Sequence, residues 1–310
     1  MAEPQSNQRF ECLARELVPQ GRLVRAWPLS GGISATMTAL EIGRPGAQPA
    51  RAIVRCPGAA ALACNPHAAR DEYRLLGALH ALGIAAPRPY LLDDAGTLLD
   101  TPSLVIEYID GAIDFAPADR AGAGRQLAAH LAAIHRADTQ AVQPLPAAPA
   151  ELGARPGQHA RALNVGRAWA ALQAGWPPPQ LNPPALLHGD FWPGNILWRG
   201  AAAVAVIDWE DAALGDPLRD LAVSRLDLLW IFGCAAMEAF TERYRALMPI
   251  DYTSLVRWDL YAALRLARLV GDDLPGWAAF FTPFGRPDIT AASISEHYQR
   301  FVAQALAQLG

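Results

Sequence analysis

The spacing of apolar positions divides the chain into a first part that mixes strands with helices and a longer part that is mostly helical. Short apolar runs bounded by turn residues predict strands, and apolar residues that recur every three or four positions predict helices. From Pro117 onward the pattern is helical except around 186–208. The first part is expected to contain helices at 7–18 and near 66–82 and strands at 22–29, 34–42, 51–56, near 88–93 and at 103–109.

The pattern changes near Asp110-Gly111, which indicates a boundary between two lobes. The chain has 310 residues, and this length is large for a single compact core. We therefore expect an α+β fold. Its N-terminal lobe, 1–110, would be a small antiparallel sheet with one main helix, and its C-terminal lobe, 111–310, would be larger and mostly helical. A cleft between two such lobes is a common place for a ligand.

Composition and charge exclude several classes of function. The net charge is −4 and no run of Lys or Arg stands out, so we expect no nucleic-acid partner. Charges or prolines interrupt every apolar stretch before the ~18 residues that a membrane span requires, so we expect no membrane partner. The start, MAEPQSNQRFE, lacks the pattern of a signal peptide. The four cysteines form no CxxC pair, which favours free thiols and a cytoplasmic location.

The segment LLHGDFWPGNILW carries the main chemical signal of the chain. After Asn195, two apolar runs flank a stretch of small residues, which predicts a β-hairpin with its turn centred near Ala201-Ala202. Residues equidistant from that centre face each other, so the hairpin would place Asn195 beside Asp208. Asp190 lies five residues before Asn195, and the Pro-Gly bend between them would bring it to the same place.

Two carboxylates and one amide in a small volume have a chemical consequence. Carboxylates held close together repel each other, so the cluster needs a cation or a raised pKa. Oxygen ligands of this kind suit Mg²⁺ (magnesium), which keeps several waters and is shared with phosphates. A structural alternative stays open, in which Asp190 and Asp208 cap helices or turns and Asn195 supports the bend.

The run HGDFWPGN, followed by VIDWEDAALGDPLRDLA, resembles the aminoglycoside phosphotransferase/choline kinase family. The resemblance extends from about Leu29 to Leu221 and is strongest at 186–221. It implies a two-lobed protein-kinase-like fold. It also implies an activity, the transfer of the γ-phosphoryl group of ATP (or GTP) to a hydroxyl of a small molecule, with Mg²⁺ as cofactor.

The same resemblance assigns roles to individual residues. It implies that Asp190 is the catalytic base and that Asn195 and Asp208 are metal ligands, because the spacing from Asp190 to Asn195 is that of a protein-kinase catalytic loop. It also implies that Asp216 and Asp220 brace this loop and do not react.

In the nucleotide half, Ser30, Gly31 and Gly32 occupy the place of the loop that covers the phosphates in the family. Glycines allow the backbone to approach phosphate oxygens. A kinase-like fold also needs a cation on the third strand, and the sequence offers Arg55 where lysine is more usual. Glu72 lies on the apolar face of the following helix, where a carboxylate needs a partner, so we expect Arg55 to pair with it.

Glu107 and Ile109 end an apolar strand at the place of the family's hinge, which binds adenine through main-chain atoms. The acceptor is left open among aminoglycoside, choline, sugar and macrolide types. A pseudokinase that binds nucleotide without transfer, and a scaffold without nucleotide binding, are alternatives from other classes.

Several aromatic and histidine residues are given lesser roles. His130 and His135 lie among apolar residues of one helix and are expected to pack there. His188 is expected to hydrogen-bond the backbone of the loop. Trp192 and Trp209 flank the chemistry and are candidates for lining an acceptor pocket.

Overall fold

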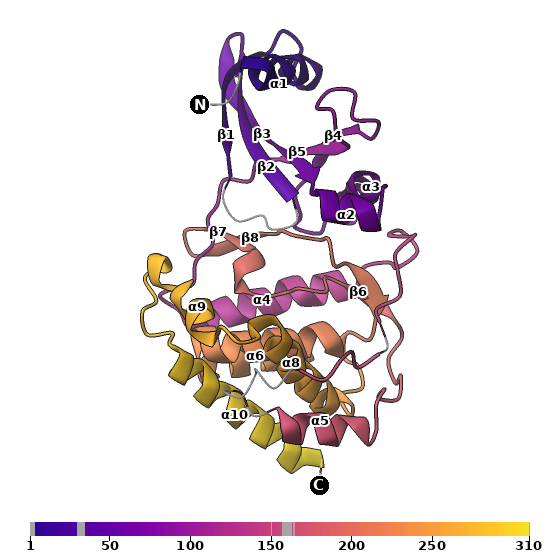
Figure 1. Ribbon diagram of the computed structural model, residues 1–310, viewed down its shortest axis with the longest axis vertical. Coiled ribbons are helices and arrows are strands. Elements are labelled where there is room, and N and C mark those ends of the chain that lie inside the picture. Colours follow the sequence, from indigo (N-terminus) through magenta and orange to yellow (C-terminus); the bar gives the residue numbers. More distant parts are fainter. Residues whose placement is uncertain (1–3, 30–34, 150, 157–162, 164, 310) are drawn as a thin grey trace. The chain divides into compact units, whose positions relative to one another are not determined.

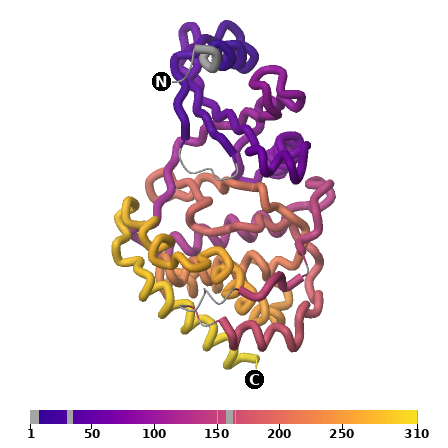
Figure 2. The backbone as a smooth tube through the Cα atoms, in the orientation of Figure 1, coloured from indigo at the N-terminus to yellow at the C-terminus, as the bar shows by residue number. Residues whose placement is uncertain are grey.

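The computed structural model describes residues 4–29, 35–149, 151–156, 163 and 165–309 (Figures 1 and 2). The chain divides into two compact units, Met1–Asp110 and Gly111–Gly310, at the step where the sequence pattern changes. In the described part of the chain, no helix is both long and apolar enough to cross a membrane.

The first unit contains the helices and strands expected there. Along the chain they are α1 (Pro4–Leu17), β1 (Arg22–Pro28), β2 (Ala35–Arg44), β3 (Ala47–Pro57), α2 (Ala59–Cys64), α3 (Ala68–Ala81), β4 (Pro89–Asp93) and β5 (Ser103–Glu107). The strands form one antiparallel sheet in the order β1-β2-β3-β5-β4. The short helix α2 was not expected, because its six residues bury no side chain and therefore leave no periodic signal.

Helices pack against this sheet through the apolar positions that predicted them. Leu13 of α1 joins Leu40 of β2, Val54 of β3 and Val105 of β5 in one buried cluster. The helix α3 buries Leu75, Leu76 and Leu79 and packs beside β4 and β5 (Figure 1). The helix α3 also contacts β3, and this packing brings the polar residues of its first turns close to that strand.

The second unit is mostly helical, as expected, with two short strand pairs. Its elements are α4 (Arg120–His135), α5 (Gly166–Gln173), β6 (Ala185–Leu187), β7 (Ile196–Arg199), β8 (Ala202–Val206), β9 (Ala213–Gly215), α6 (Leu218–Phe232), α7 (Cys234–Leu247), α8 (Leu255–Val270), α9 (Leu274–Ala279) and α10 (Ala291–Leu309). Helix α6 is buried along almost its whole length and packs against α7, α8 and α10. It is the central helix of this unit (Figure 1).

The hairpin of β7 and β8 has a register that differs from the expected one. Arg199 pairs with Ala202, so the turn is Gly200-Ala201 and not Ala201-Ala202. Gly200 has a φ of +58°, a conformation that a two-residue hairpin turn requires at its first position and that glycine adopts without strain. The glycine therefore shifts the centre of the hairpin towards the N-terminus.

Two features decide which residue lies opposite Asn195. The turn at Gly200-Ala201 alone would place Val206 there, and a register shift of one residue between Leu197 and Trp198 moves the partner to Ile207. The amide of Ile207 donates a hydrogen bond to the Asn195 carbonyl at 2.9 Å, so Asn195 faces Ile207. The expected pairing of Asn195 with Asp208 is wrong by one residue. Asp208 follows directly after the paired position, and its φ of +66° turns the chain there.

Candidate active site

The loop that carries Asp190 begins directly after a buried strand. β6 pairs with β9, which brings the start of this loop next to the segment that follows the hairpin. Gly189 has a φ of +85°, and a Cβ at this position would collide with the backbone carbonyl of Asp211. Only glycine fits at this position, because the backbone conformation and the close neighbour both exclude a side chain.

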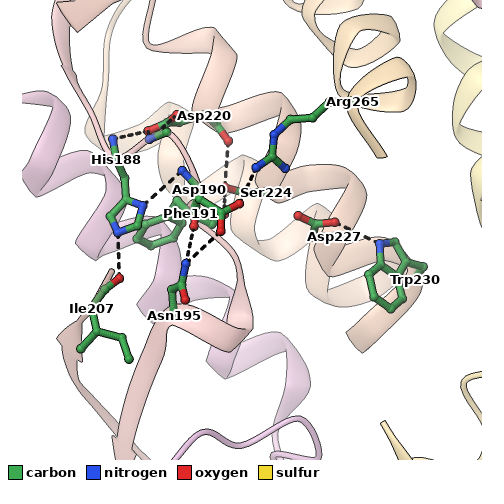
Figure 3. A network of polar contacts seen from close by, with 11 residues as sticks. His188, Asp190, Phe191, Asn195, Ile207, Asp220, Ser224, Asp227, Trp230 and Arg265 are labelled. Atoms are coloured by element: carbon green, nitrogen blue, oxygen red, sulfur yellow. Dashed lines mark hydrogen bonds and ion pairs between the residues drawn. The ribbon is translucent and has the colours of Figure 1, made fainter. Parts of the chain in front are cut away.

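The side chain of Asn195 holds Asp190 in place. Its Nδ2 donates to the Asp190 carboxylate oxygen Oδ2 at 3.1 Å and to the Asp190 backbone carbonyl at 2.9 Å. A 3₁₀ turn at Pro193–Asn195 folds the chain back to make these contacts possible. The sequence prediction that Asp190 and Asn195 meet is confirmed, and Figure 3 shows the two side chains pointing toward each other.

His188 hydrogen-bonds the backbone of the loop, as expected. Its Nε2 lies 3.0 Å from the carbonyl of Ile207, which can only accept, so Nε2 carries the proton. Nδ1 is then the acceptor for the Asp190 amide at 3.3 Å. Burial lowers the pKa of His188, which keeps the ring neutral and preserves this arrangement at neutral pH.

Asp220 of α6 braces the start of the loop. It accepts from the amide of His188 at 2.7 Å and from the amide of Gly189 at 3.2 Å. His135 of α4 lies 3.4 Å from the same carboxylate, and the other His135 nitrogen lies 2.6 Å from the Tyr244 hydroxyl of α7. Burial raises the pKa of Asp220, but the hydrogen bonds and charge of these partners outweigh it and hold that pKa below its usual range.

Two further supports differ from the sequence prediction. The Ser224 hydroxyl of α6 donates to the Phe191 carbonyl at 2.7 Å, so α6 holds the loop at a second point. Among the described contacts, Asp216 makes no hydrogen bond to the loop. It accepts from the Leu218 amide at 3.0 Å and from the Trp258 indole at 3.3 Å, and thereby supports the start of α6.

Arg265 of α8 lies far from the loop along the chain but contacts the Asp190 carboxylate. Its Nη2 donates to Asp190 Oδ1 at 2.5 Å (Figure 3). Asp227 of α6 lies close enough to Arg265 for their charges to interact, and it accepts from the Trp230 indole at 3.1 Å. Burial raises the pKa of Asp227 to about 7, while Arg265 opposes and Asp190 reinforces that rise.

The donor set fits a magnesium ion shared with phosphates. Asn195 uses its Nδ2 for Asp190, and its Oδ1 accepts no hydrogen bond from the residues that the structure describes. Asp208 is exposed one position beyond the hairpin pair. Among the described residues, no group of three or more His, Cys, Asp or Glu side chains could hold a metal alone. An ion bound by one amide, one carboxylate and substrate phosphates needs no such group.

In the first unit, Arg55 and Glu72 form the predicted pair. Arg55 Nε donates to Glu72 Oε2 at 2.9 Å between β3 and α3, and the side chains are only 8% and 13% exposed. A charge-assisted hydrogen bond in such shielded surroundings fixes the positions of both groups. The guanidinium also approaches the sulfur of Met37 on β2, at 3.9 Å.

Glu107 and Ile109 lie at the end of β5 and just after it. The Glu107 amide already donates to the Arg88 carbonyl at 2.8 Å. None of the hydrogen bonds among the described residues uses the main chain of Ile109. Ser30, Gly31 and Gly32 lie outside the described residues.

The two tryptophans that flank the loop differ in exposure. Trp209 is 2% exposed, donates to the Val206 carbonyl at 3.0 Å and packs on His188, so it is part of the core and does not line a pocket. Trp192 is partly exposed and stacks on Phe115 at a centroid distance of 5.7 Å.

The comparisons with known proteins place this arrangement in a family. Residues 26–256 match the model of the phosphotransferase enzyme family (APH), and the chain belongs to this family. It is 26% identical over 242 residues to acyl-CoA dehydrogenase family member 11 of Rattus norvegicus; the match covers 66% of the chain and 31% of that protein. The chain thus spans less than a third of the length of this relative.

Two further relatives are much nearer in size. The chain is 32% identical over 161 residues to a homoserine kinase of Methylocella silvestris, covering 48% of the chain and 50% of the kinase. A choline kinase structure from Streptococcus pneumoniae superposes with a TM-score of 0.59 and 19% identity, over 98% of this chain and 99% of that one. The fold is therefore the protein-kinase-like α+β fold that the sequence indicated.

From the sequence, no role was expected for Arg265, Asp227 or Ser224, and only a packing role was expected for His135. Asp227 stands in the apolar run LAVSRLDLLWIF, where a carboxylate on a buried helix needs a partner. That signal predicts a partner for Asp227 without telling which residue provides it.

Proposed function

We propose that this chain is an ATP-dependent phosphotransferase that moves the γ-phosphoryl group to a hydroxyl of a small molecule. The hydrogen bonds from Asn195 to Asp190, on a loop braced by buried α6, carry the proposal. Such a loop presents one oriented carboxylate, and family membership supports its use in phosphoryl transfer.

Asp190 is the proposed catalytic base. It would accept a hydrogen bond from the acceptor hydroxyl and orient its oxygen towards the γ-phosphorus. As the new oxygen–phosphorus bond forms, the bond between the γ-phosphorus and the bridging oxygen breaks and the nucleoside diphosphate leaves. The hydroxyl proton passes to Asp190, so the charges balance. Positioning and electrostatics supply most of the rate gain in such a reaction.

Asn195 and Asp208 are the proposed metal ligands. Asn195 would offer its Oδ1, since Nδ2 is occupied by Asp190. A bound magnesium ion would neutralise charge on the phosphates of the nucleotide. The alternative in which these residues serve only as structural caps predicts that magnesium has no effect on nucleotide binding.

In the first unit we propose a nucleotide site. Arg55, fixed by Glu72, would contact phosphate oxygens, and a guanidinium can bind two of them at once. Ser30, Gly31 and Gly32 would cover the phosphates. The Glu107 carbonyl and the Ile109 amide would bind the edge of the adenine, because an adenine edge offers one donor and one acceptor. A cytoplasmic location is part of the same proposal.

The acceptor is a small hydroxylated molecule whose identity stays open. The relatives include a homoserine kinase and a choline kinase, so family membership indicates the reaction and not the acceptor. ATP and GTP both remain candidates as the donor.

The test is an acceptor screen with Mg²⁺ and either ATP or GTP, read by the mass gain of the acceptor. Asp190→Ala should lower transfer by about 1,000-fold and leave nucleotide affinity within about twofold, because the base acts only on the hydroxyl. Asp138→Ala is the matched control, since this exposed carboxylate bonds only the neighbouring Gln140 amide among the described contacts. Nucleotide binding without any phosphorylated product would support the pseudokinase alternative, and wild-type turnover in Asp190→Ala would refute the base assignment.

A further inference from the structure

A partly buried chain of charges runs from the proposed base into the helical core of the second unit. It begins at Asp190, continues through Arg265 on α8 and reaches Asp227 on α6 (Figure 3). Neither Arg265 nor Asp227 belongs to the loop, and both come from helices far along the chain. The loop therefore receives a direct contact from α8 as well as the braces that it receives from α6.

The two carboxylate oxygens of Asp190 are held by different groups. Asn195 donates to Oδ2 at 3.1 Å, and Arg265 donates to Oδ1 at 2.5 Å. A carboxylate gripped at both oxygens by donors from two directions cannot rotate about its last torsion without losing one of them. Each oxygen has a second lone pair, so a hydroxyl can still bind. The grip thus limits orientation and leaves the base usable.

The charges around Arg265 explain why it stays in this position. Burial lowers the pKa of Arg265, but the carboxylates of Asp190 and Asp227 outweigh this effect and hold that pKa above its usual value. The Arg265 side chain is 21% exposed, and that of Asp190 is 29% exposed. In such surroundings water competes weakly for the guanidinium, so the contact with Asp190 persists.

We propose that Arg265 is a positioning residue for the phosphotransferase reaction, which holds the Asp190 carboxylate in the orientation that receives the acceptor hydroxyl. This inference rests on the proposed function of Asp190. The charge of Asp227 also attracts the guanidinium. Arg265 therefore acts through Asp190, and its loss should affect turnover while leaving nucleotide binding nearly unchanged.

The second unit offers a matched comparison for a purely structural ion pair. Arg225 of α6 forms a two-pronged pair with Asp259 of α8, with distances of 3.1 and 3.2 Å, and donates to the Thr241 hydroxyl at 2.7 Å. This pair joins the same two helices, and none of its described contacts involves the loop. If Arg265 only held α6 against α8, its substitution should have the same effects as substitution of Arg225.

The first experiment measures steady-state kinetics of wild type, Arg265→Gln and Arg265→Lys. The assay uses Mg²⁺ and ATP with the acceptor found by the screen above. Arg265→Gln should lower kcat by about 100-fold, because a misplacement near 1 Å at a catalytic group has that cost. The KM for ATP should stay within about twofold. Arg265→Lys keeps one cation and should recover part of the loss. Arg225→Gln should lower the melting temperature without changing kcat more than about twofold.

The double variant Arg265→Gln/Asp227→Asn separates positioning from folding. Arg265→Gln alone leaves a buried carboxyl without its guanidinium, and the added Asp227→Asn removes that charge. The double variant should recover melting temperature but not kcat. Recovery of kcat together with stability would overturn the proposal, because the defect would then be one of folding.

A crystal structure of Arg265→Gln provides a readout that does not need an acceptor. The Asp190 carboxylate should be rotated from its wild-type orientation, with the Asn195 Nδ2 to Oδ2 contact lengthened beyond hydrogen-bond distance. The proposal is refuted if the Asp190 side chain keeps both its orientation and this contact. If the wild type transfers no phosphoryl group to any acceptor, the proposed function fails, and the crystal structure still decides whether Arg265 positions Asp190.

Discussion

The ion pair of the first unit and the loop of the second hold their charged groups in different ways. Arg55 and Glu72 are 17 residues apart and join β3 to α3 through a hydrogen bond of 2.9 Å. Asp190 is held by Asn195, five residues away, and by Arg265, 75 residues away. The loop around it is also fastened by Asp220 of α6.

This difference indicates which substitutions should disturb each site. The pair in the first unit depends on the local fit of one strand to one helix, so a substitution there should have a local effect. The loop depends on helices that are distant in sequence, so a change in any of its supports should reach Asp190. The predictions below separate these two kinds of dependence, and they run from the largest expected effect to the smallest.

The largest effect is expected at Asp220, the brace shared by the loop and two helices. Asp220→Asn removes a buried charge that His135 and two loop amides contact, so the free energy of unfolding should fall by about 3–5 kcal/mol. The pKa of Asp220 lies below its usual range, so the charge stabilises the fold at every pH above about 4, and this contribution is lost only on further acidification. Urea unfolding from pH 5 to pH 8 should therefore show a constant difference from wild type. A loss below 1 kcal/mol would mean that the brace is dispensable.

The next effect concerns Asp227 and has the opposite dependence on pH. The unfolded chain releases this proton near the usual pKa of 3.8, and the folded protein releases it at about 7, so unfolding releases a proton between these values. The stability contributed by this group therefore falls as pH rises from 4 to 7, by about 1.4 kcal/mol per pH unit and roughly 4 kcal/mol in total. Asp227→Asn should remove this slope. Urea unfolding of both proteins at pH 5 and pH 8 measures it, and parallel pH profiles would contradict the expectation.

A smaller effect is expected at Gly189, which tests the loop backbone itself. Gly189→Ala forces a side chain into a φ of +85° and against the Asp211 carbonyl, so stability should fall by about 2 kcal/mol. Gly200→Ala is the matched control, because Gly200 also has positive φ, but a Cβ there would meet no neighbour within 4 Å. Thermal unfolding should show a larger loss for Gly189→Ala than for Gly200→Ala. Equal losses would mean that only the backbone conformation matters.

The smallest effect is expected in the first unit. Arg55→Lys keeps a cation beside Glu72, so the free energy of unfolding should change by less than about 1 kcal/mol and the KM for ATP by less than about threefold. Arg55→Met removes the cation and should raise that KM by about 10-fold or more. Steady-state kinetics at saturating acceptor distinguish the two variants. A large rise in KM for Arg55→Lys would show that the planar fork of arginine is required.

Much of the fold was predictable because its signals are local. Period-two and period-three-or-four patterns located the sheet of the first unit and the helices that pack on it, and they did so without any knowledge of neighbours. The pairing of Arg55 with Glu72 followed from a carboxylate on an apolar helix face. The contact between Asp190 and Asn195 followed from their spacing around a Pro-Gly bend. In each case the partners lie within 17 residues of each other along the chain.

The hairpin shows where local reasoning stops. A displacement of one residue separates the expected pair of Asn195 and Asp208 from the observed pair of Asn195 and Ile207. Apolar runs on both strands tolerate either register, because small residues fill the positions after the turn. Gly200 sets the turn through its positive φ, and a register shift of one residue between Leu197 and Trp198 sets the pairing at Asn195. Neither feature follows from the hydrophobic pattern.

The sequence by itself determined the elements, the family and the chemical identity of the loop, because those depend on short-range spacing and residue type. Only the tertiary structure decided that Arg265 and Asn195 grip the two oxygens of Asp190, and that His135 and Tyr244 stand behind Asp220. Those contacts depend on how α4, α6, α7 and α8 rotate and slide against one another. Such packing follows from the fit of whole helix surfaces, and no short stretch of sequence contains it.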